Sequence, residues 1–100
     1  MKYAQPMAPT HFFYILRCSD ASFYVGSTTN LENRLKKHNQ GKGAAHTVKR
    51  RPVQLVYHEQ FSNLNDAVKR ERQVKRWSRA KKEALISGDM EMLRKSSKRH

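Results

Sequence analysis

Two short runs of aromatic and aliphatic residues near the start of the chain predict a β-hairpin. FFYILR at residues 12–17 and FYVGS at residues 23–27 are rich in strand-forming side chains, and CSDAS between them has the composition of a turn. If the hairpin closes about Asp20, Tyr14 and Tyr24 have the same parity and face the same side of the sheet. Each strand then carries one phenol hydroxyl to that face, where phenylalanine would fill the space without a polar group to satisfy.

The segment after the hairpin has the period of an amphipathic helix. Thr29, with Glu32 three residues later, has the spacing of a capping box, and Gly41 and Gly43 end the pattern. The positions that follow the i, i+3, i+4, i+7 rule and share one face are Leu31, Arg34, Leu35 and His38. This face holds the only leucines of the segment. We therefore expect it to be buried and to direct its arginine and histidine inward or to the rim.

A third strand follows a basic loop. The loop covers residues 41–52, and the strand covers residues 53–59 with the sequence VQLVYHE. Val53, Leu55 and Tyr57 alternate there with the remaining positions. Because successive side chains of a strand point to opposite faces, this alternation predicts that the three share one face.

Two more helices are predicted after this strand. Asn63 and Asp66 form a second capping box, which opens a helix through LNDAVKRERQVKRW at residues 64–77. Ser78 can cap a further helix that ends at about Ile86. The interior stripe of the first of these helices consists of Leu64, Ala67, Val68, Glu71 and Val74. An acid therefore lies on an otherwise apolar stripe.

Length and composition limit the chain to one domain. It has 100 residues, of which 37% are hydrophobic, and this is enough for one modest core but not for two. We expect a loose leader over residues 1–10, a folded domain over residues 11–87 and a basic tail over residues 88–100. The sequence contains no internal repeat, and it does not determine an oligomeric state.

The net charge of +13 indicates a polyanionic partner. Nucleic acid is the first candidate, and an anionic membrane surface is the second. The membrane is disfavoured because no stretch approaches the roughly 18 apolar residues of a spanning helix. MKYAQPMAPT at the start lacks the apolar run of a signal peptide, and the single cysteine, Cys18, excludes an internal disulfide. We therefore expect a cytoplasmic protein.

Three polar groups occupy positions that the period assigns to the interior: Arg34, His38 and Glu71. An unpaired charge is costly to bury, so each must be paired, bound to a metal or placed at a cleft. Glu71 is the only acid among residues 69–82, which hold eight Lys or Arg. A structural explanation stays open, with Arg34 and Glu71 as a partly buried ion pair, His38 as a satisfied core histidine and the tyrosines as core aromatics.

Taken together, these segments resemble the GIY-YIG nuclease superfamily, and most closely its small stand-alone bacterial YhbQ-like proteins. The resemblance covers roughly residues 11–87. It rests on five segments in order: FFYIL, FYVG, LENRLKKHNQGKGAAHT, RRPVQLVYHEQF and DAVKRERQVKRWSRAKKEALI. Two departures are visible, because the first motif has no glycine and no Asn follows Asn65. The resemblance implies an α+β fold in which helices flank a small three-stranded antiparallel sheet.

The resemblance also implies a catalytic set. In it Glu71 would hold Mg²⁺ or Mn²⁺, which need only one or two protein carboxylates when a phosphate completes the shell. Arg34 would grip the scissile phosphate and stabilise its transition state. Tyr14 would act as the base or orient the water, with nearby positive charge favouring its phenolate, and His38 is the alternative base. Tyr24 would orient water or phosphate, with Gly26 giving the backbone room.

The expected activity is metal-dependent hydrolysis of DNA phosphodiester bonds, either structure-selective on single-stranded, flap or branched DNA or nonspecific. The alternative is a catalytically weak or inactive module that binds DNA or, less expectedly, RNA, in repair or on ribosomal RNA. Neither reading names a pathway. In both, backbone phosphates would be contacted by Lys36, Lys37, Lys42, His46, Lys49, Arg50, Arg51, Arg70 and Lys75.

Overall fold

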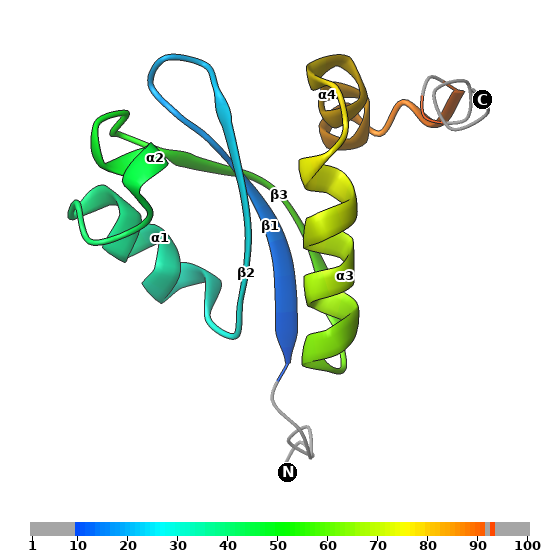
Figure 1. The fold of residues 1–100 in the computed structure, drawn as a ribbon, viewed down its shortest axis with the longest axis horizontal. Coiled ribbons are helices and arrows are strands. Elements are labelled where there is room, and N and C mark those ends of the chain that lie inside the picture. Colours follow the sequence, from blue (N-terminus) through cyan, green and yellow to red (C-terminus); the bar gives the residue numbers. More distant parts are fainter. Residues whose placement is uncertain (1–9, 92, 94–100) are drawn as a thin grey trace, which may run out of the picture.

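A computed structural model describes residues 10–91 and 93, and its centre is a three-stranded antiparallel sheet. The strands β1 (His11–Arg17), β2 (Phe23–Thr28) and β3 (Gln54–Phe61) are ordered β2-β1-β3, so β1 is central. One face is covered by α1 and α2 and the other by α3 and α4 (Figure 1). The helices are α1 (Leu31–Asn39), α2 (Ala45–Val48), α3 (Leu64–Lys75) and α4 (Arg79–Ser87). The expected α+β fold is confirmed.

The hairpin closes where the turn chemistry predicts. Tyr14 pairs with Gly26 and Leu16 pairs with Tyr24, so the register is centred on Asp20. The Asp20 carboxylate accepts a hydrogen bond from the backbone N–H of Ser22 at 3.0 Å, which closes the turn. The two tyrosines therefore do face the same side of the sheet, and it is the side that α1 covers.

The sheet is apolar on both faces because each face has its own helical layer. Phe13 and Ile15 point toward α3 and α4 and pack with Val25, Val74 and Leu85. Tyr14 and Leu16 point the other way and pack with Cys18 and Val53, under the leucines of α1. Alternate residues of the central strand thus belong to different cores, and Tyr14 belongs to the core of the α1 layer.

A β-bulge in β3 corrects one expectation. Ile15 pairs with Tyr57 and Leu16 pairs with Leu55, so Val56 is an additional residue on the β3 side. One extra residue reverses the alternation beyond it. Val53 and Leu55 share the α1 layer as predicted, but Tyr57 packs in the α3 layer, so its predicted place was wrong.

The N-cap of the first helix lies one residue later than predicted. Asn30, not Thr29, is the N-cap, and its side chain accepts from the backbone N–H of Asn33 at 2.9 Å. The predicted stop is correct, because α1 ends at Asn39 and Gly41 has a φ of +79°, which glycine adopts without strain. The loop expected over residues 41–52 contains the single turn α2, which the sequence pattern did not predict.

The later helices begin at their predicted caps. Asn63 accepts from the N–H of Asp66 at 2.9 Å, and Ser78 accepts from the N–H of Lys81 at 3.1 Å. The expected leader lies outside the described residues except for Thr10, and the expected tail is described only at residues 88–91 and 93. None of the helices in the described part has the length and apolar character needed to cross a bilayer.

Candidate active site

A polar hollow of about 350 Å³ opens on the α1 layer. We call it the α1 hollow. Its lining combines side chains of β2, α1 and the loop before α2, and it consists of Tyr24, Arg34, Lys37, His38, Lys42, Gly43 and Ala44. Three of the five predicted catalytic residues and two of the predicted phosphate-binding lysines are therefore brought together here.

Three aromatic rings form one cluster beside this hollow. The Tyr14 hydroxyl lies 3.2 Å from Nε2 of His38, and both side chains are 1% exposed. The Tyr24 ring lies 5.2 Å from the His38 ring and 6.4 Å from the Tyr14 ring, measured between centroids. The tyrosines predicted from the hairpin parity and the histidine predicted from the helix period therefore lie in contact.

Burial sets the protonation of this cluster. It raises the pKa of the Tyr14 hydroxyl to about 12; Tyr24 acts in the same direction, and Arg34 offsets only part of the rise. Burial also lowers the pKa of His38, and the positive charge of Arg34 lowers it further. Arg34 therefore favours the phenolate as expected, but burial outweighs it, and both groups are neutral at neutral pH.

The loop after α1 closes over the far edge of the His38 ring. Thr47 of α2 is fully buried, and its Oγ1 lies 2.8 Å from Nδ1 of His38. A Cβ atom at Gly43 would collide with that same nitrogen, so the loop backbone passes directly against the imidazole. Thr47 was missed from the sequence, because a lone threonine in an irregular basic loop carries no periodic signal.

Gly26 has a comparable role beside Tyr14. It is the β2 residue opposite Tyr14 in the hairpin, and a Cβ atom there would lie 2.5 Å from the Tyr14 hydroxyl. No other residue type leaves room for the phenol at this position. The glycine of FYVG therefore makes room for the phenol of Tyr14, whereas the resemblance implied room for the backbone beside Tyr24.

Glu71 lies on the opposite layer and is not among the residues that line the α1 hollow. It lies on α3, which packs against β1 and the edge strand β2. Its Oε1 accepts a hydrogen bond from the Ser27 hydroxyl at 2.8 Å, and its Oε2 pairs with Lys75 Nζ at 2.8 Å. Its charge is near enough to contribute to the raised pKa of Tyr14. This carboxylate forms its ion pair with Lys75. The structural explanation left open above, an ion pair between Arg34 and Glu71, is therefore wrong.

Glu71 is a suitable ligand for a hard divalent cation. Its side chain is 18% exposed, and its Oε2 already pairs with a cationic group, the ammonium of Lys75. That lysine is 52% exposed and free to swing away. Within residues 10–91 and 93, no three His, Cys, Asp or Glu side chains gather as a metal cage. A single carboxylate fits Mg²⁺ or Mn²⁺, which retain water and bind substrate phosphate.

The predicted phosphate-binding residues near the hollow divide into two groups. Lys37 and Lys42 line it, whereas Lys36 and Lys49 are exposed outside the lining. His46 stacks on Tyr24 at 6.2 Å between ring centroids, so it borders the cluster. The exposed ammonium groups are thus available on and around the α1 layer.

The predicted arginines are used mainly by the protein itself. Arg50 pairs with Asp20 at 3.0 Å and donates to the His46 carbonyl, while Arg51 donates to the Val48 carbonyl at 2.8 Å. The pair of Arg50 with Asp20 fastens the loop to the hairpin turn, and the other two bonds are made within the loop. Arg70 lies on the α3 layer, where it pairs with Glu59 at 2.9 Å, so it does not gather with the α1 hollow.

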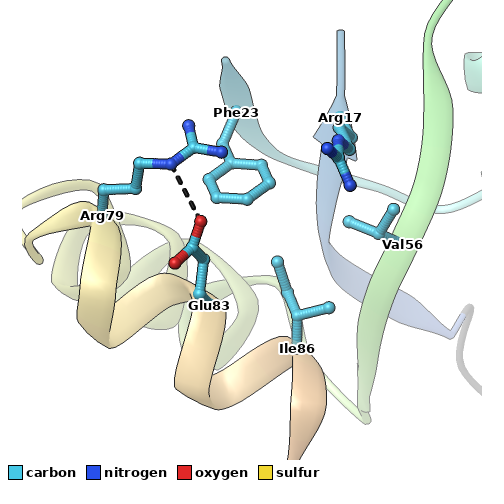
Figure 2. A pocket seen from close by; sticks show the side chains of 6 residues that line it. All are labelled: Arg17, Phe23, Val56, Arg79, Glu83 and Ile86. Atoms are coloured by element: carbon cyan, nitrogen blue, oxygen red, sulfur yellow. Dashed lines mark hydrogen bonds and ion pairs between the residues drawn. The ribbon is translucent and has the colours of Figure 1, made fainter. Parts of the chain in front are cut away.

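A second hollow, of about 260 Å³, lies on the α3 layer between the sheet and α4 (Figure 2). Phe23, Val56 and Ile86 form its apolar side. The Arg79 guanidinium covers the Phe23 ring at 4.4 Å from the centroid and pairs with Glu83 at 2.9 Å (Figure 2). This hollow contains none of the predicted catalytic residues.

The comparison with known families agrees with this arrangement. Residues 10–84 match the family model described as the GIY-YIG catalytic domain. The chain belongs to the GIY-YIG family. The GIY-YIG match covers all three strands and the helices α1 to α3, and therefore every element that contributes to the site.

Curated relatives of this GIY-YIG chain are named only as UPF0213 proteins. One from Staphylococcus saprophyticus is 51% identical over 77 residues, which is 77% of this chain and 94% of the relative. One from Bacillus pumilus is 49% identical over 76 residues, which is 76% of this chain and 78% of the relative.

Two solution NMR structures share the fold. The UPF0213 protein BH0048 from Bacillus halodurans is 46% identical with a TM-score of 0.52, covering 78% of this chain and 83% of its own. The protein EF2693 from E. faecalis is 39% identical with a TM-score of 0.56, covering 90% and 92%. These names assign no activity.

Proposed function

We propose that the protein is a metal-dependent endonuclease that hydrolyses DNA phosphodiester bonds, either structure-selectively on single-stranded, flap or branched DNA or nonspecifically. The observation that carries the proposal is the contact of 3.2 Å between the Tyr14 hydroxyl and His38 Nε2, beside a hollow lined by Arg34. A buried phenol and imidazole in contact at the edge of a cationic hollow have the geometry of a proton-transfer pair facing an anion.

Phosphate binding is assigned to the cationic lining. Arg34 offers a planar fork of donors that suits two phosphate oxygens and the added negative charge of the transition state. Lys37 and Lys42, which line the same hollow, hold the flanking backbone. Contacts of this kind carry no base information, which supports structure-selective or nonspecific cleavage.

The proton path uses Tyr14 and His38 together, so the two candidate bases become one unit. The attacking water gives a proton to the Tyr14 oxygen while the phenol gives its own proton to His38 Nε2. Because Tyr14 is only 1% exposed, this step requires neighbouring side chains, among them Arg34, to move aside and admit the water. The imidazolium that results is stabilised by the negative charge that develops on the phosphate.

Glu71 would hold the divalent ion, whose contribution is Lewis-acid stabilisation of the phosphate and leaving oxygen. Ser27 orients the carboxylate through its hydroxyl, at 2.8 Å from Oε1. Lys75 would leave Oε2 of Glu71 and turn to the DNA backbone. The ammonium group would then neutralise a phosphate of the bound strand.

A second candidate function is a nucleic-acid-binding module without useful catalysis. Two observations favour it: Lys75 already occupies Oε2 of Glu71 at 2.8 Å, and the pKa of Tyr14 is raised to about 12. A binding module would use the same lysines but would have no need for the contact between Tyr14 and His38.

The deciding experiment uses the purified full chain with single-stranded, duplex, flap and branched DNA in Mg²⁺, Mn²⁺ or EDTA. We expect cutting only with metal, and loss of cutting with retained DNA binding in Glu71→Ala. Arg34→Ala should also lose cutting. Glu83→Ala is the matched control, because Glu83 makes a similar i,i+4 pair with Arg79 on the α3 layer. If wild type cuts no DNA above the level of Glu71→Ala, the binding module is correct.

A further inference from the structure

Thr47 makes two contacts that together determine its hydrogen-bond direction. Its hydroxyl donates to the Ala44 carbonyl at 2.9 Å, and its Oγ1 lies 2.8 Å from Nδ1 of His38. A threonine hydroxyl has one proton. Once that proton is given to Ala44, Oγ1 can only accept, so the proton of the second contact must belong to Nδ1.

This direction has a consequence at the other side of the ring. A neutral imidazole carries a single N–H, so a proton on Nδ1 leaves Nε2 with a free lone pair. His38 is 1% exposed, and burial lowers its pKa, which keeps the ring neutral. The lone pair of Nε2 then faces the Tyr14 hydroxyl at 3.2 Å, and the phenol donates to it.

We infer that Thr47 is a positioning residue that fixes His38 in the Nδ1–H tautomer, so that Nε2 can receive the Tyr14 proton. The inference rests on the proposed function for its purpose, although the tautomer itself is a property of the free protein. With the other tautomer, Nε2 would be a donor, and the path from phenol to imidazole would be blocked at its first step.

Among the described residues, Thr47 is the hydrogen-bond partner of His38 Nδ1. The backbone of Gly43 lies against the same nitrogen so closely that a Cβ atom would collide with it. Tyr24 contacts the imidazole through its ring, at 5.2 Å between centroids. The turn α2 therefore has a function, because it carries Thr47 to a depth that an extended basic loop would not reach.

The test is long-range ¹H–¹⁵N NMR of the labelled full chain without DNA or metal, at a pH where His38 is neutral. We expect wild-type His38 to show the Nδ1–H tautomer, with a pyrrole-type Nδ1 and an imine-type Nε2. His58, which is exposed on β3, gives the reference spectrum of a less constrained ring. An Nε2–H tautomer in wild-type His38 overturns the inference, and this outcome does not depend on any cleavage assay.

Two variants then test Thr47 itself. Thr47→Val keeps the shape of the side chain but removes the hydroxyl, so we expect His38 to shift toward the Nε2–H tautomer. Thr47→Ser restores an acceptor in the same place and should restore the Nδ1–H tautomer. If Thr47→Val fails to fold, the serine variant and the wild-type spectrum still decide the question. An unchanged tautomer in a folded Thr47→Val variant overturns the inference.

The kinetic arm separates this inference from the proposed function. In single-turnover cleavage at saturating DNA, Thr47→Val should be slower by about tenfold or more, with DNA affinity unchanged and with recovery in Thr47→Ser. A wild-type protein with the Nδ1–H tautomer but no cleavage would overturn the proposed function alone. A Thr47→Val variant that loses the tautomer but cuts at the wild-type rate would overturn the role of Thr47.

Discussion

A Cβ atom on Gly26 would lie 2.5 Å from the Tyr14 hydroxyl, so the two strands of the hairpin meet at the proposed catalytic phenol. We predict that Gly26→Ala displaces the phenol and slows single-turnover cleavage by about 100-fold, because a shift of about 1 Å has this effect on a reacting group. The fold should survive, with a loss of about 1–3 kcal/mol in the free energy of unfolding.

A double-mutant cycle checks the cause of this effect. Removing the hydroxyl in Tyr14→Phe removes the closest contact of the new Cβ, although the ring carbon Cζ at 2.7 Å remains. The stability cost of Gly26→Ala should therefore be smaller in the Tyr14→Phe background than in wild type. Equal costs in the two backgrounds would show that the hydroxyl contact is not what makes the glycine necessary.

Lys75 and the divalent ion should compete for Glu71. The Lys75–Glu71 pair is an i,i+4 contact with a half-exposed lysine, so it contributes only about 0.3–0.5 kcal/mol. We predict that Lys75→Gln lowers the Mn²⁺ concentration for half-maximal binding about twofold, as followed by the EPR signal of free Mn²⁺ without DNA. Glu71→Gln should abolish this binding. Unchanged Mn²⁺ affinity in both variants would remove Glu71 from the metal site.

The pH dependence of stability should report on His38. Its pKa in the folded protein is lowered by burial, with Arg34 adding to the effect, while the unfolded chain keeps an ordinary value of about 6.5. Between those two values the unfolded state binds more protons, so stability is full above about pH 6.5 and is lost as the pH falls toward the folded pKa. Urea titrations over this range should show the slope in wild type and a smaller one in His38→Gln.

Cleavage should follow the same group. Protonated His38 cannot accept the Tyr14 proton, so the rate should fall on the acid side with an inflection below about pH 6.5. Tyr14 has a pKa raised to about 12 by burial, so its hydroxyl remains a donor throughout neutral pH. An acid inflection at the same pH in His38→Gln would assign it to another group.

The arrangement on the α1 layer was predictable where two independent periods agreed. The strand parity placed Tyr14 and Tyr24 on one face, and the helix period placed Arg34 and His38 on the face that packs beneath them. Each rule uses only local geometry. The strand and the helix each carry buried apolar residues, and these fix which face turns inward. The polar residues on such stripes were therefore informative.

The remaining features depend on events that leave no local pattern. The bulge at Val56 sends Tyr57 to the other layer, and it follows from how β3 pairs with β1. Asn30 rather than Thr29 caps α1, although both residue types are suitable caps. Thr47 acquires its role only because α2 folds back on the ring of His38. The bulge and the Thr47 contact are tertiary, so the local periodicity of the sequence does not encode them, and the cap is a choice between two adjacent residues that the pattern alone does not separate.

Lys37 and Lys42, the two lysines of the α1 hollow, and Lys36, the neighbour of Lys37 on α1, offer a matched test of DNA binding. Lys37 and Lys42 line the hollow, whereas Lys36 is the adjacent, exposed residue outside it. We predict that Lys37→Ala and Lys42→Ala weaken DNA binding more than Lys36→Ala does, although all three remove one positive charge. For duplex DNA each lining variant should also reduce the slope of log K against log salt by about 0.9, the value for one lost phosphate contact, while Lys36→Ala should change it less. Fluorescence anisotropy across a salt series measures both quantities. Equal losses and equal slopes for the three variants would mean that DNA is held by diffuse charge, and that the α1 hollow does not direct the strand.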